Sequence, residues 1–545
     1  MARIGGACYP PGMTSLLDTR RPRLLLTLLC IAMWAPGFWT LPPTDRDESR
    51  FAQATKQMLE TGDFVRIMNG TEARNRKPIG IHWLQAPFVA AADALGVAAA
   101  NPIWPYRIPS ALGGLLAVLA CFEAGVLTVG RRAALLGAGM LAASVLLVAE
   151  VHIAKTDAAL LGATTLAMAM LARAYLDPGG LSRRGAAVFW LAMGAGVLLK
   201  GPITPMVAGL AVAALLIADR RAAWLGCLRT GWGAPLMLAV VAPWFVAIGV
   251  ATEGRFFSDA IGGDLGRKLT SGDDAHWGPP GLHLVLLPLL LFPAAAALPA
   301  GFAAAWRGRR SAGVRFLLAW IGPAWLVFEA TPTKLPHYAL PLYPAVCLLL
   351  ALGVVGQAGA RWRWVGAGLA GLGVVLLAAG SAAAPIFLHM GWWLGLPAAA
   401  GVLAVGWWAL RGWRPGCAAA AVVAAPLLYL GVLGWEAPRL SPLWIAPRVA
   451  AGLEPTGRGP LGAVGYAEPS LMFLAGTGTL WLRPDEAAGA LIDGAVGALL
   501  VGDRDLEAVR AGLAARGAAV RETAAVAGFN YSRGRWVVLT VLTRG

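Results

Sequence analysis

The sequence predicts a polytopic α-helical membrane protein of about thirteen transmembrane helices with a C-terminal extracytoplasmic α/β domain. Of its 545 residues, 58% are hydrophobic and 14% are charged, whereas a soluble domain carries about 25% charged residues. The apolar residues lie in long blocks separated by short arginine-containing loops, as in multi-pass membrane proteins. A water-soluble enzyme, a disordered chain and a fibrous protein are excluded. The positive-inside rule then explains the net charge of +16 better than nucleic-acid binding does.

The apolar segments give the expected membrane spans, in chain order. We expect spans near residues 22–40, 108–129, 133–150, 157–176, 186–200, 202–218, 233–252, 281–305, 314–329, 336–356, 363–380, 391–410 and 416–436. With a cytoplasmic N-terminus, every inner connection is rich in arginine and poor in acids, which predicts an odd number of spans and a C-terminal domain on the outer side of the membrane. The first span lacks a small-residue cleavage site, so we expect a retained anchor.

The remaining segments define the expected domains. Residues 1–437 form the transmembrane domain, with a long first periplasmic loop at 41–107 and a second outer loop at 253–280. Residues 438–545 alternate short apolar runs with helical patterns, which predicts a periplasmic α/β domain. The six cysteines show no CxxC spacing and fall outside the outer loops, so neither a disulfide framework nor a cysteine metal site is expected.

Rare polar residues point to one face of the membrane. Arginine greatly outnumbers lysine, and all six lysines map to the outer face: Lys56, Lys77, Lys155, Lys200, Lys268 and Lys334. Cations gathered there suit a cavity that handles an anionic group such as a phosphate. The alternative is that positive-inside pressure and composition leave lysine no other place.

The acidic residues allow two interpretations as well. Asp47 and Glu48 follow the first span directly, and a carboxylate at a membrane edge is a candidate general base. Alternatively, they stabilise the first turn of a helix that Thr44 caps. Asp157 begins a span and has the same two interpretations. Arg107 lies in an amphipathic stretch, and we expect it at the surface.

Several short motifs are weak individually but form an ordered set. They are Asp47-Glu48-Ser49-Arg50-Phe51, Gly62-Asp63-Phe64, Lys77-Pro78, His82-Trp83-Leu84, Thr156-Asp157, Lys200-Gly201-Pro202, Lys334 and Tyr338-Ala339-Leu340-Pro341. In this order the chain resembles the C-type membrane glycosyltransferases that use polyprenyl-phosphate-linked sugars. It is most similar to the lipid A aminoarabinose transferases, relatives of the protein O-mannosyltransferases. The resemblance covers essentially the whole chain, although Ile79 replaces a second proline after Lys77-Pro78.

The resemblance implies roles for individual residues. The catalytic acids would be Asp47, Glu48 and Asp157, with Asp47 as the candidate general base for the acceptor. The donor phosphate would be held by Lys77 and Arg267, in a cavity lined by Tyr338, although Arg255 or Lys268 could replace Arg267. Supporting roles would fall to Arg50, Lys200, Lys334 and His337.

The implied function is transfer of a pentose or hexose from a polyprenyl-phosphate donor to lipid A or another envelope glycan, at the outer face of the inner membrane. No cofactor is expected. Two acids could hold a divalent cation, but no paired histidines accompany them, so no required metal is expected. No nucleic-acid partner is expected. The alternatives are a protein O-glycosyltransferase, a lipid-linked sugar transporter or flippase, and an assembly protein whose outer domain recruits partners.

Overall fold

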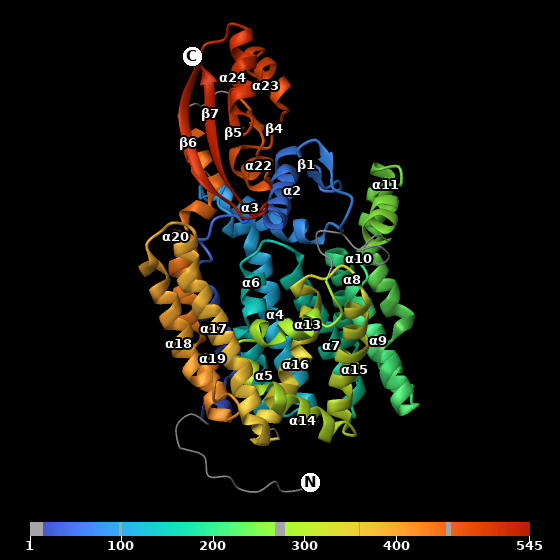
Figure 1. Ribbon diagram of the computed structural model, residues 1–545. Coiled ribbons are helices and arrows are strands. Elements are labelled where there is room, and N and C mark those ends of the chain that lie inside the picture. Colours follow the sequence, from blue (N-terminus) through green and yellow to red (C-terminus); the bar gives the residue numbers. More distant parts are fainter. Residues whose placement is uncertain (1–14, 98–100, 267–277, 359, 454–458) are drawn as a thin grey trace.

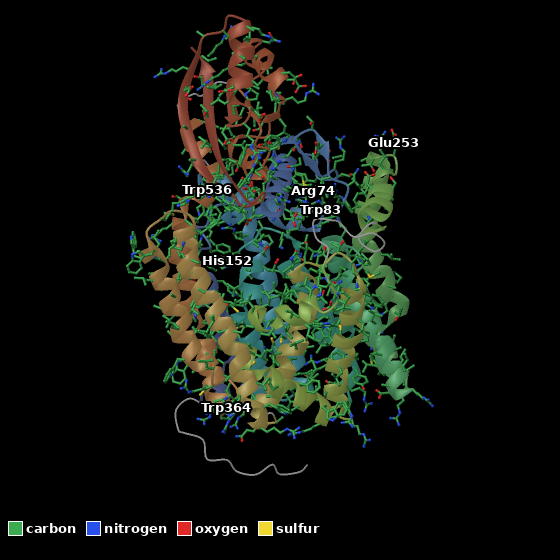
Figure 2. All side chains as sticks on the ribbon, in the orientation of Figure 1. Arg74, Trp83, His152, Glu253, Trp364 and Trp536 are labelled. Carbon is green, nitrogen blue, oxygen red and sulfur yellow. The ribbon has the colours of Figure 1, made fainter. Side chains whose placement is uncertain are left out.

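The computed structural model describes residues 15–97, 101–266, 278–358, 360–453 and 459–545. It confirms the predicted fold class, because a bundle of membrane-spanning helices carries a small sheet domain at one end (Figure 1). We call this the domain end of the bundle. The opposite end carries Trp364 (Figure 2).

The bundle is built from fifteen helices within the described residues. They are α1 (Pro22–Trp34), α4 (Trp104–Thr128), α5 (Arg131–Ala143), α6 (Val145–Val151), α7 (Thr156–Leu176), α8 (Arg183–Lys200), α9 (Ile203–Asp219), α10 (Thr230–Ala251), α13 (Leu282–Leu290), α14 (Leu298–Gly308), α15 (Ala312–Ala330), α16 (Tyr343–Val355), α17 (Arg363–Phe387), α18 (Leu396–Ala409) and α19 (Pro415–Tyr429). A 3-10 turn, η6 (Pro336–Leu342), leads into α16.

The expected number of thirteen spans is not confirmed. Within the described residues, eight helical segments are long and apolar enough to cross a membrane, and two bent pairs raise the number to ten at most. The expected spans near 22–40 and 202–218 fall on α1 and α9, which have 13 and 17 residues. Both are shorter than the ~20 residues that a straight span needs.

Close packing of α4 against α7 fixes the residues at the domain end. A Cβ on Gly113 would lie 2.4 Å from Ala159 Cα, and one on Gly162 would lie 2.6 Å from the Gly113 carbonyl oxygen. Only glycine permits this approach of the two backbones. The contact holds the first turn of α7, which contains Asp157, against α4.

The first outer loop forms a layer of its own on the domain end. It contains α2 (Asp47–Thr61), the hairpin β1 (Met68–Asn69) and β2 (Glu72–Ala73), and α3 (Gly80–Ala94). Gly62 ends α2 with a φ of 71°, the left-handed conformation that glycine adopts readily at a helix C-terminus. Asp63 then accepts hydrogen bonds from the N–H groups of Val65 and Arg66, both at 3.0 Å. The Gly-Asp-Phe motif therefore shapes a turn.

The C-terminal domain is a five-stranded mixed sheet with helices on both faces. The strands, in spatial order, are β4 (Leu480–Trp481), β3 (Leu461–Val464), β5 (Ala498–Gly502), β7 (Arg535–Arg544) and β6 (Val520–Asn530). β3 runs parallel to β4 and β5, and β7 runs antiparallel to β5 and β6. The helices are α21 (Ile445–Leu453), α22 (Pro469–Ala475), α23 (Pro484–Ile492) and α24 (Leu506–Ala515). The domain boundary at 437/438 stays a prediction.

Successive residues of β5 pack into two separate cores. Ala498 and Leu500 contribute to the core under α21 and α22. Leu499 and Val501 contribute to the core under α23 and α24. Because side chains alternate along a strand, a run that is apolar at every position is buried on both faces of its sheet.

The sheet domain is docked directly on α2 and α3. Phe473 of α22 is fully buried among Ala52, Val89 and Tyr106, and its ring lies 5.3 Å from that of Tyr106. Lys56 donates to the Phe473 carbonyl oxygen at 3.1 Å. α2 thus lies between the membrane bundle and the sheet domain.

The N-terminal end of α2 is held by the same domain. The Asp45 N–H donates to the Tyr531 hydroxyl at 2.5 Å, and the Arg46 guanidinium donates to the Ser532 carbonyl oxygen. Arg46 has a φ of 64°, a conformation that non-glycine residues adopt rarely. The contact with Ser532 fixes the strained residue that precedes Asp47.

Candidate functional site

Asp47 is the first residue of α2, where the unpaired N–H groups of a helix favour negative charge. Its side chain is 43% exposed, and Oδ1 lies 3.6 Å from Arg74 Nη2. The partial burial of Asp47 would raise its pKa, but Lys77 and Arg74 outweigh this and hold the pKa below its ordinary value. Asp47 is therefore an ionised, accessible carboxylate beside cations.

Lys77 lies close enough to Asp47 for the two charges to interact. Its ammonium is 4.9 Å from the centre of the Phe51 ring, and the Arg74 guanidinium is 4.7 Å from that ring. Burial lowers the pKa of Lys77 to about 8, against the opposing effect of Asp47. The lysine is still charged at neutral pH.

Gly80 explains why the Lys-Pro-Ile-Gly segment lies there. A Cβ on Gly80 would come within 2.6 Å of the Leu198 carbonyl oxygen in the last turn of α8. The absence of a side chain brings the segment that carries Lys77 against the end of α8, which carries Lys200. Gly201, with a φ of 64°, then reverses the chain after Lys200.

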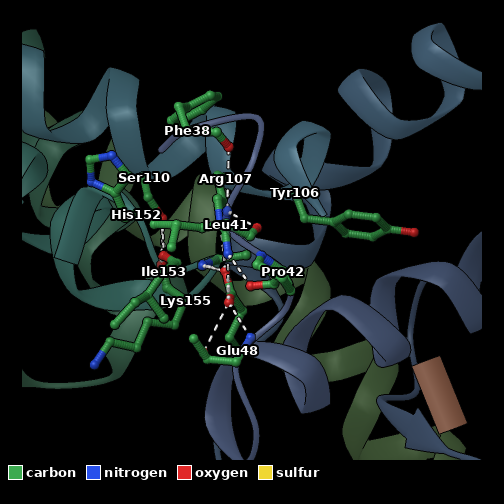
Figure 3. A network of polar contacts seen from close by, with 12 residues as sticks. Phe38, Leu41, Pro42, Glu48, Tyr106, Arg107, Ser110, His152, Ile153 and Lys155 are labelled. Carbon is green, nitrogen blue, oxygen red and sulfur yellow. Dashed lines mark hydrogen bonds and ion pairs between the residues drawn. The ribbon is translucent and has the colours of Figure 1, made fainter. Parts of the chain in front are cut away.

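Glu48, the neighbour of Asp47, has a different environment (Figure 3). Its side chain and that of Arg107 are both 0% exposed. Arg107 Nε donates to Oε1 at 2.8 Å and Nη2 donates to Oε2 at 3.0 Å. The Ala154 N–H donates to Oε1 at 2.9 Å, and the Thr44 N–H and hydroxyl donate to Oε2 at 2.8 and 2.9 Å.

Both oxygens of Glu48 are thus fully used. Burial would raise the pKa of Glu48, but Arg107 and the N–H groups of Thr44 and Ala154 keep it below its ordinary value. Arg107 also donates to the carbonyl oxygens of Phe38, Leu41 and Pro42. The expectation that Arg107 lies at the surface is wrong, because this guanidinium ties the end of the first span to α2 and α4.

Asp157 is the centre of a second cluster at the start of α7. It is 4% exposed. The Lys200 ammonium donates to its Oδ1, the Lys155 ammonium lies 3.5 Å from its Oδ2, and His337 Nε2 lies 3.8 Å from its Oδ1. Glu150 of α6 belongs to the same cluster, since its Oε1 lies 3.0 Å from Lys155 Nζ.

Of the other expected site residues, Tyr338 borders the cluster of Asp157, whereas Lys334 has a structural role. Tyr338 is half-buried, and its ring lies 5.1 Å from the Lys200 ammonium, so it borders the cluster. Arg50 is half-buried in the first turn of α2. Lys334 is buried and donates to the carbonyl oxygens of Gly278 and Thr331 at 3.0 and 2.8 Å, so it holds a turn. Arg267 lies outside the described residues.

Sequence reasoning missed two members of the site. Glu150 ends a long apolar stretch, and an acid inside such a stretch is a functional candidate by default, so a signal was present. Arg74, which lies next to Asp47 and Phe51, is one of many loop arginines, and nothing in its sequence context distinguishes it. Together the residues place cations from three loops around the carboxylates of Asp47 and Asp157.

Comparisons with known proteins find relatives of this sequence. Residues 21–253 match the sequence model of the family described as dolichyl-phosphate-mannose-protein mannosyltransferase. An undecaprenyl phosphate-α-4-amino-4-deoxy-L-arabinose arabinosyl transferase of Pseudomonas aeruginosa is 29% identical over 342 residues, which cover 61% of this chain and 60% of that protein. One from Pectobacterium carotovorum is 28% identical over 361 residues, covering 64% and 61%. The chain thus spans about 60% of the length of the curated relatives that it matches.

Solved structures show the same fold. The crystal structure of ArnT from Cupriavidus metallidurans bound to undecaprenyl phosphate superposes with a TM-score of 0.76 at 20% identity, covering 95% of this chain and 97% of that one. The apo form gives a TM-score of 0.73 with the same coverage. The resemblance to the aminoarabinose transferases inferred from the sequence is confirmed.

Proposed function

We propose that this chain is a membrane glycosyltransferase that moves a sugar from a polyprenyl-phosphate donor to a lipid A-type or other envelope acceptor. The observation that carries the proposal is the placement of Asp47, an accessible carboxylate, beside Lys77 and Arg74 at the domain end of the bundle. An anion site next to an ionised acid suits this reaction. The names of the relatives support an undecaprenyl-phosphate-type donor.

The reaction divides between the two kinds of group. The bond between the anomeric carbon and the phosphate oxygen breaks, and the phosphate leaves with that electron pair. Lys77 stabilises the charge that the phosphate gains, in a half-buried site where electrostatic effects are strong. The resemblance assigns Arg267 to the same phosphate. The acceptor hydroxyl attacks the anomeric carbon and passes its proton to Asp47, the general base.

Other residues support these two. Asp157 holds the Lys200 ammonium beside the Tyr338 ring, which shapes the cavity next to Lys77. Glu48 has no free oxygen to offer a substrate, so we assign it the role of fixing α2, and with it Asp47, on the bundle. The proposal includes no cofactor.

We further propose that the domain end faces the periplasm and the N-terminus the cytoplasm. Turns at the opposite end carry Arg–Trp pairs, with Arg309 over Trp306, Arg363 over Trp364 and Arg411 over Trp407. Arginine-rich turns favour the cytoplasmic side, and tryptophan favours the membrane interface. This orientation places the site where lipid-linked sugars of the outer leaflet reach it.

The test is mass spectrometry of lipid A and total envelope glycolipids from cells with the intact gene, without it, and with Asp47→Asn. A sugar-sized mass should disappear in the deletion and in Asp47→Asn. Glu253→Gln is the matched control. Glu253 is an exposed acid just after the C-terminal end of α10, and it lies away from Arg74 of the site (Figure 2). Full activity of Asp47→Asn would exclude the general-base role.

A second candidate is transfer to protein, which the description of the matching family favours. In that case the lipid spectra are unchanged, and secreted proteins lose a glycan in the deletion strain. A transporter or flippase would keep its function in Asp47→Asn, because no proton transfer from an acceptor is involved.

A further inference from the structure

Lys155 lies at the centre of a set of metal-type donors. Glu150, Asp157 and His337 offer ligand atoms that all lie within 4.8 Å of one another. Two carboxylates and an imidazole are a common donor set for divalent cations in proteins. In this chain, however, the Lys155 ammonium occupies the space between them.

The contacts of Lys155 Nζ reach all three donors. It lies 3.0 Å from Glu150 Oε1, 3.5 Å from Asp157 Oδ2 and 3.4 Å from His337 Nδ1. The three donors also lie close to each other, with His337 Nδ1 3.6 Å from Glu150 Oε1. The lysine thus contacts every member of the set at once.

We propose that Lys155 is a built-in cation that takes the place of a divalent metal ion in this site. Its ammonium neutralises Glu150 and Asp157 and positions Asp157 for its contact with Lys200. Lys155 is therefore a positioning residue, and the site works without a metal. The catalytic consequence rests on the proposed transferase function, but the replacement of a metal by lysine does not.

Charge balance supports this role. The cluster contains two carboxylates, Glu150 and Asp157, and two ammonium groups, Lys155 and Lys200, and none of these side chains is more than 17% exposed. Buried charges are stable only when they are paired. Without Lys155 the cluster has one excess negative charge.

The backbone of Lys155 is held independently of its side chain. The Ala154 N–H donates to Glu48, and the Ser110 hydroxyl donates to the carbonyl oxygens of Ile153 and Lys155 at 2.8 and 3.2 Å. The side chain of Lys155 points away from this network (Figure 3). A substitution at Lys155 therefore changes the cluster and leaves the turn anchored.

Glu150 has an oxygen ready for another cation. Its Oε1 contacts Lys155, but the buried Oε2 has no hydrogen-bond partner among the described residues. In a variant without the ammonium, both oxygens of Glu150 become available. Lys155→Ala should therefore create a divalent-cation site out of residues that the chain already contains.

The test uses the full-length protein, purified in detergent and stripped of metal, with Mn²⁺ as the probe. Binding is measured by equilibrium dialysis and by the electron paramagnetic resonance signal of free Mn²⁺. Lys155→Ala should bind one Mn²⁺ per chain at least about tenfold more tightly than the wild type, because two carboxylates and an imidazole lose the ammonium that lies between them. Adding Glu150→Gln to Lys155→Ala should abolish that binding.

Two further variants make the result decisive. Lys155→Gln keeps a hydrogen bond to Glu150 within reach and replaces the alanine variant if that one does not fold. Lys56→Ala is the matched control, because within the described residues the one carboxylate paired with Lys56 is that of Glu60, at 3.8 Å, and its other bond is to the Phe473 carbonyl oxygen, so this variant should gain no Mn²⁺ site. A folded neutral variant that binds no more Mn²⁺ than the wild type would refute the proposal, as would a wild-type Mn²⁺ site that Glu150→Gln removes.

Sugar transfer gives a separate readout. Wild-type activity should be insensitive to EDTA, whereas Lys155→Ala should lose activity and recover part of it with Mn²⁺. A purely structural lysine would not make activity metal-dependent. If no variant transfers sugar at all, the proposed function fails, while the Mn²⁺ binding data still decide the role of Lys155.

Discussion

Replacing Glu48 by glutamine should destabilise the protein strongly, although the side chain keeps its shape. Five donors from Arg107, Thr44 and Ala154 converge on the two oxygens of Glu48. Whichever way the amide turns, its NH₂ group meets at least two of these donors. At ~1.5–3 kcal/mol for each lost charge-assisted hydrogen bond, two lost bonds cost ~3–6 kcal/mol.

An independent estimate agrees with this range, because breaking a buried ion pair typically costs ~3–5 kcal/mol. The assay is equilibrium unfolding of the purified protein in mixed micelles. Asp47→Asn is the matched control: Asp47 is 43% exposed, and its one ion pair within the described part of the chain is with Arg74 at 3.6 Å, so the substitution should change stability by less than ~1 kcal/mol. The substitution of Glu48 should therefore lower stability, whereas that of the neighbouring Asp47 should lower activity.

The pH dependence of the free energy of unfolding tests the same ion pair. The folded-state pKa of Glu48 lies below its ordinary value of 4.5, so its contribution is fully present above that value and is lost as pH falls through the folded pKa. The stability gap between the wild type and Glu48→Gln should narrow in acid. A Glu48→Gln protein as stable as the wild type, or less stable only in acid, would refute the structural role of the pair.

Three further outcomes are expected. Gly113→Ala should destabilise the α4–α7 contact by about 1–3 kcal/mol, measured by the same unfolding assay, whereas Gly209→Ala, with nothing within 4 Å of its Cβ, should be neutral or slightly stabilising. The value of kcat/KM for the donor should fall as pH rises through about 8, the pKa of Lys77, and Lys77→Arg should extend activity to higher pH; an unchanged profile would contradict a role for the Lys77 charge. Phe473→Ala should cost about 3–5 kcal/mol and increase amide hydrogen exchange in α2, while Leu480→Ala, on a residue that is 37% exposed, should leave that exchange unaltered.

Much of the architecture was accessible from the sequence because membrane helices and buried strands leave strong apolar signals. The apolar runs at 461–466, 480–482, 495–501 and 536–542 fall on β3, β4, β5 and β7. β6 was missed, because none of its residues before Val526 is buried and this edge strand therefore lacks a continuous apolar pattern. The number of spans was harder to predict, because short helices such as α1 belong to the bundle although they are too short to cross a membrane as straight spans.

The position of the site could be predicted from the sequence better than the contacts of its individual residues. Scarce lysines correctly indicated one end of the bundle, where Lys77, Lys155 and Lys200 do converge. Arg107 could not be placed, because its partner Glu48 is 59 residues away and no local pattern links them. Lys334 showed the same limit, since the backbone carbonyl groups that hold its ammonium leave no trace in the sequence.

The docking of the sheet domain on α2 has a consequence for biosynthesis. The residues that hold Asp45 and Lys56 lie 486 and 417 positions later in the chain. At about 5–20 residues per second, a ribosome needs roughly 20–100 s to add them. During that time α2 has been made but Arg46 has no carbonyl group of Ser532 to bind. The polypeptide therefore acquires a fixed Asp47 only when β6 and the turn after it have been translated and delivered to the same side of the membrane.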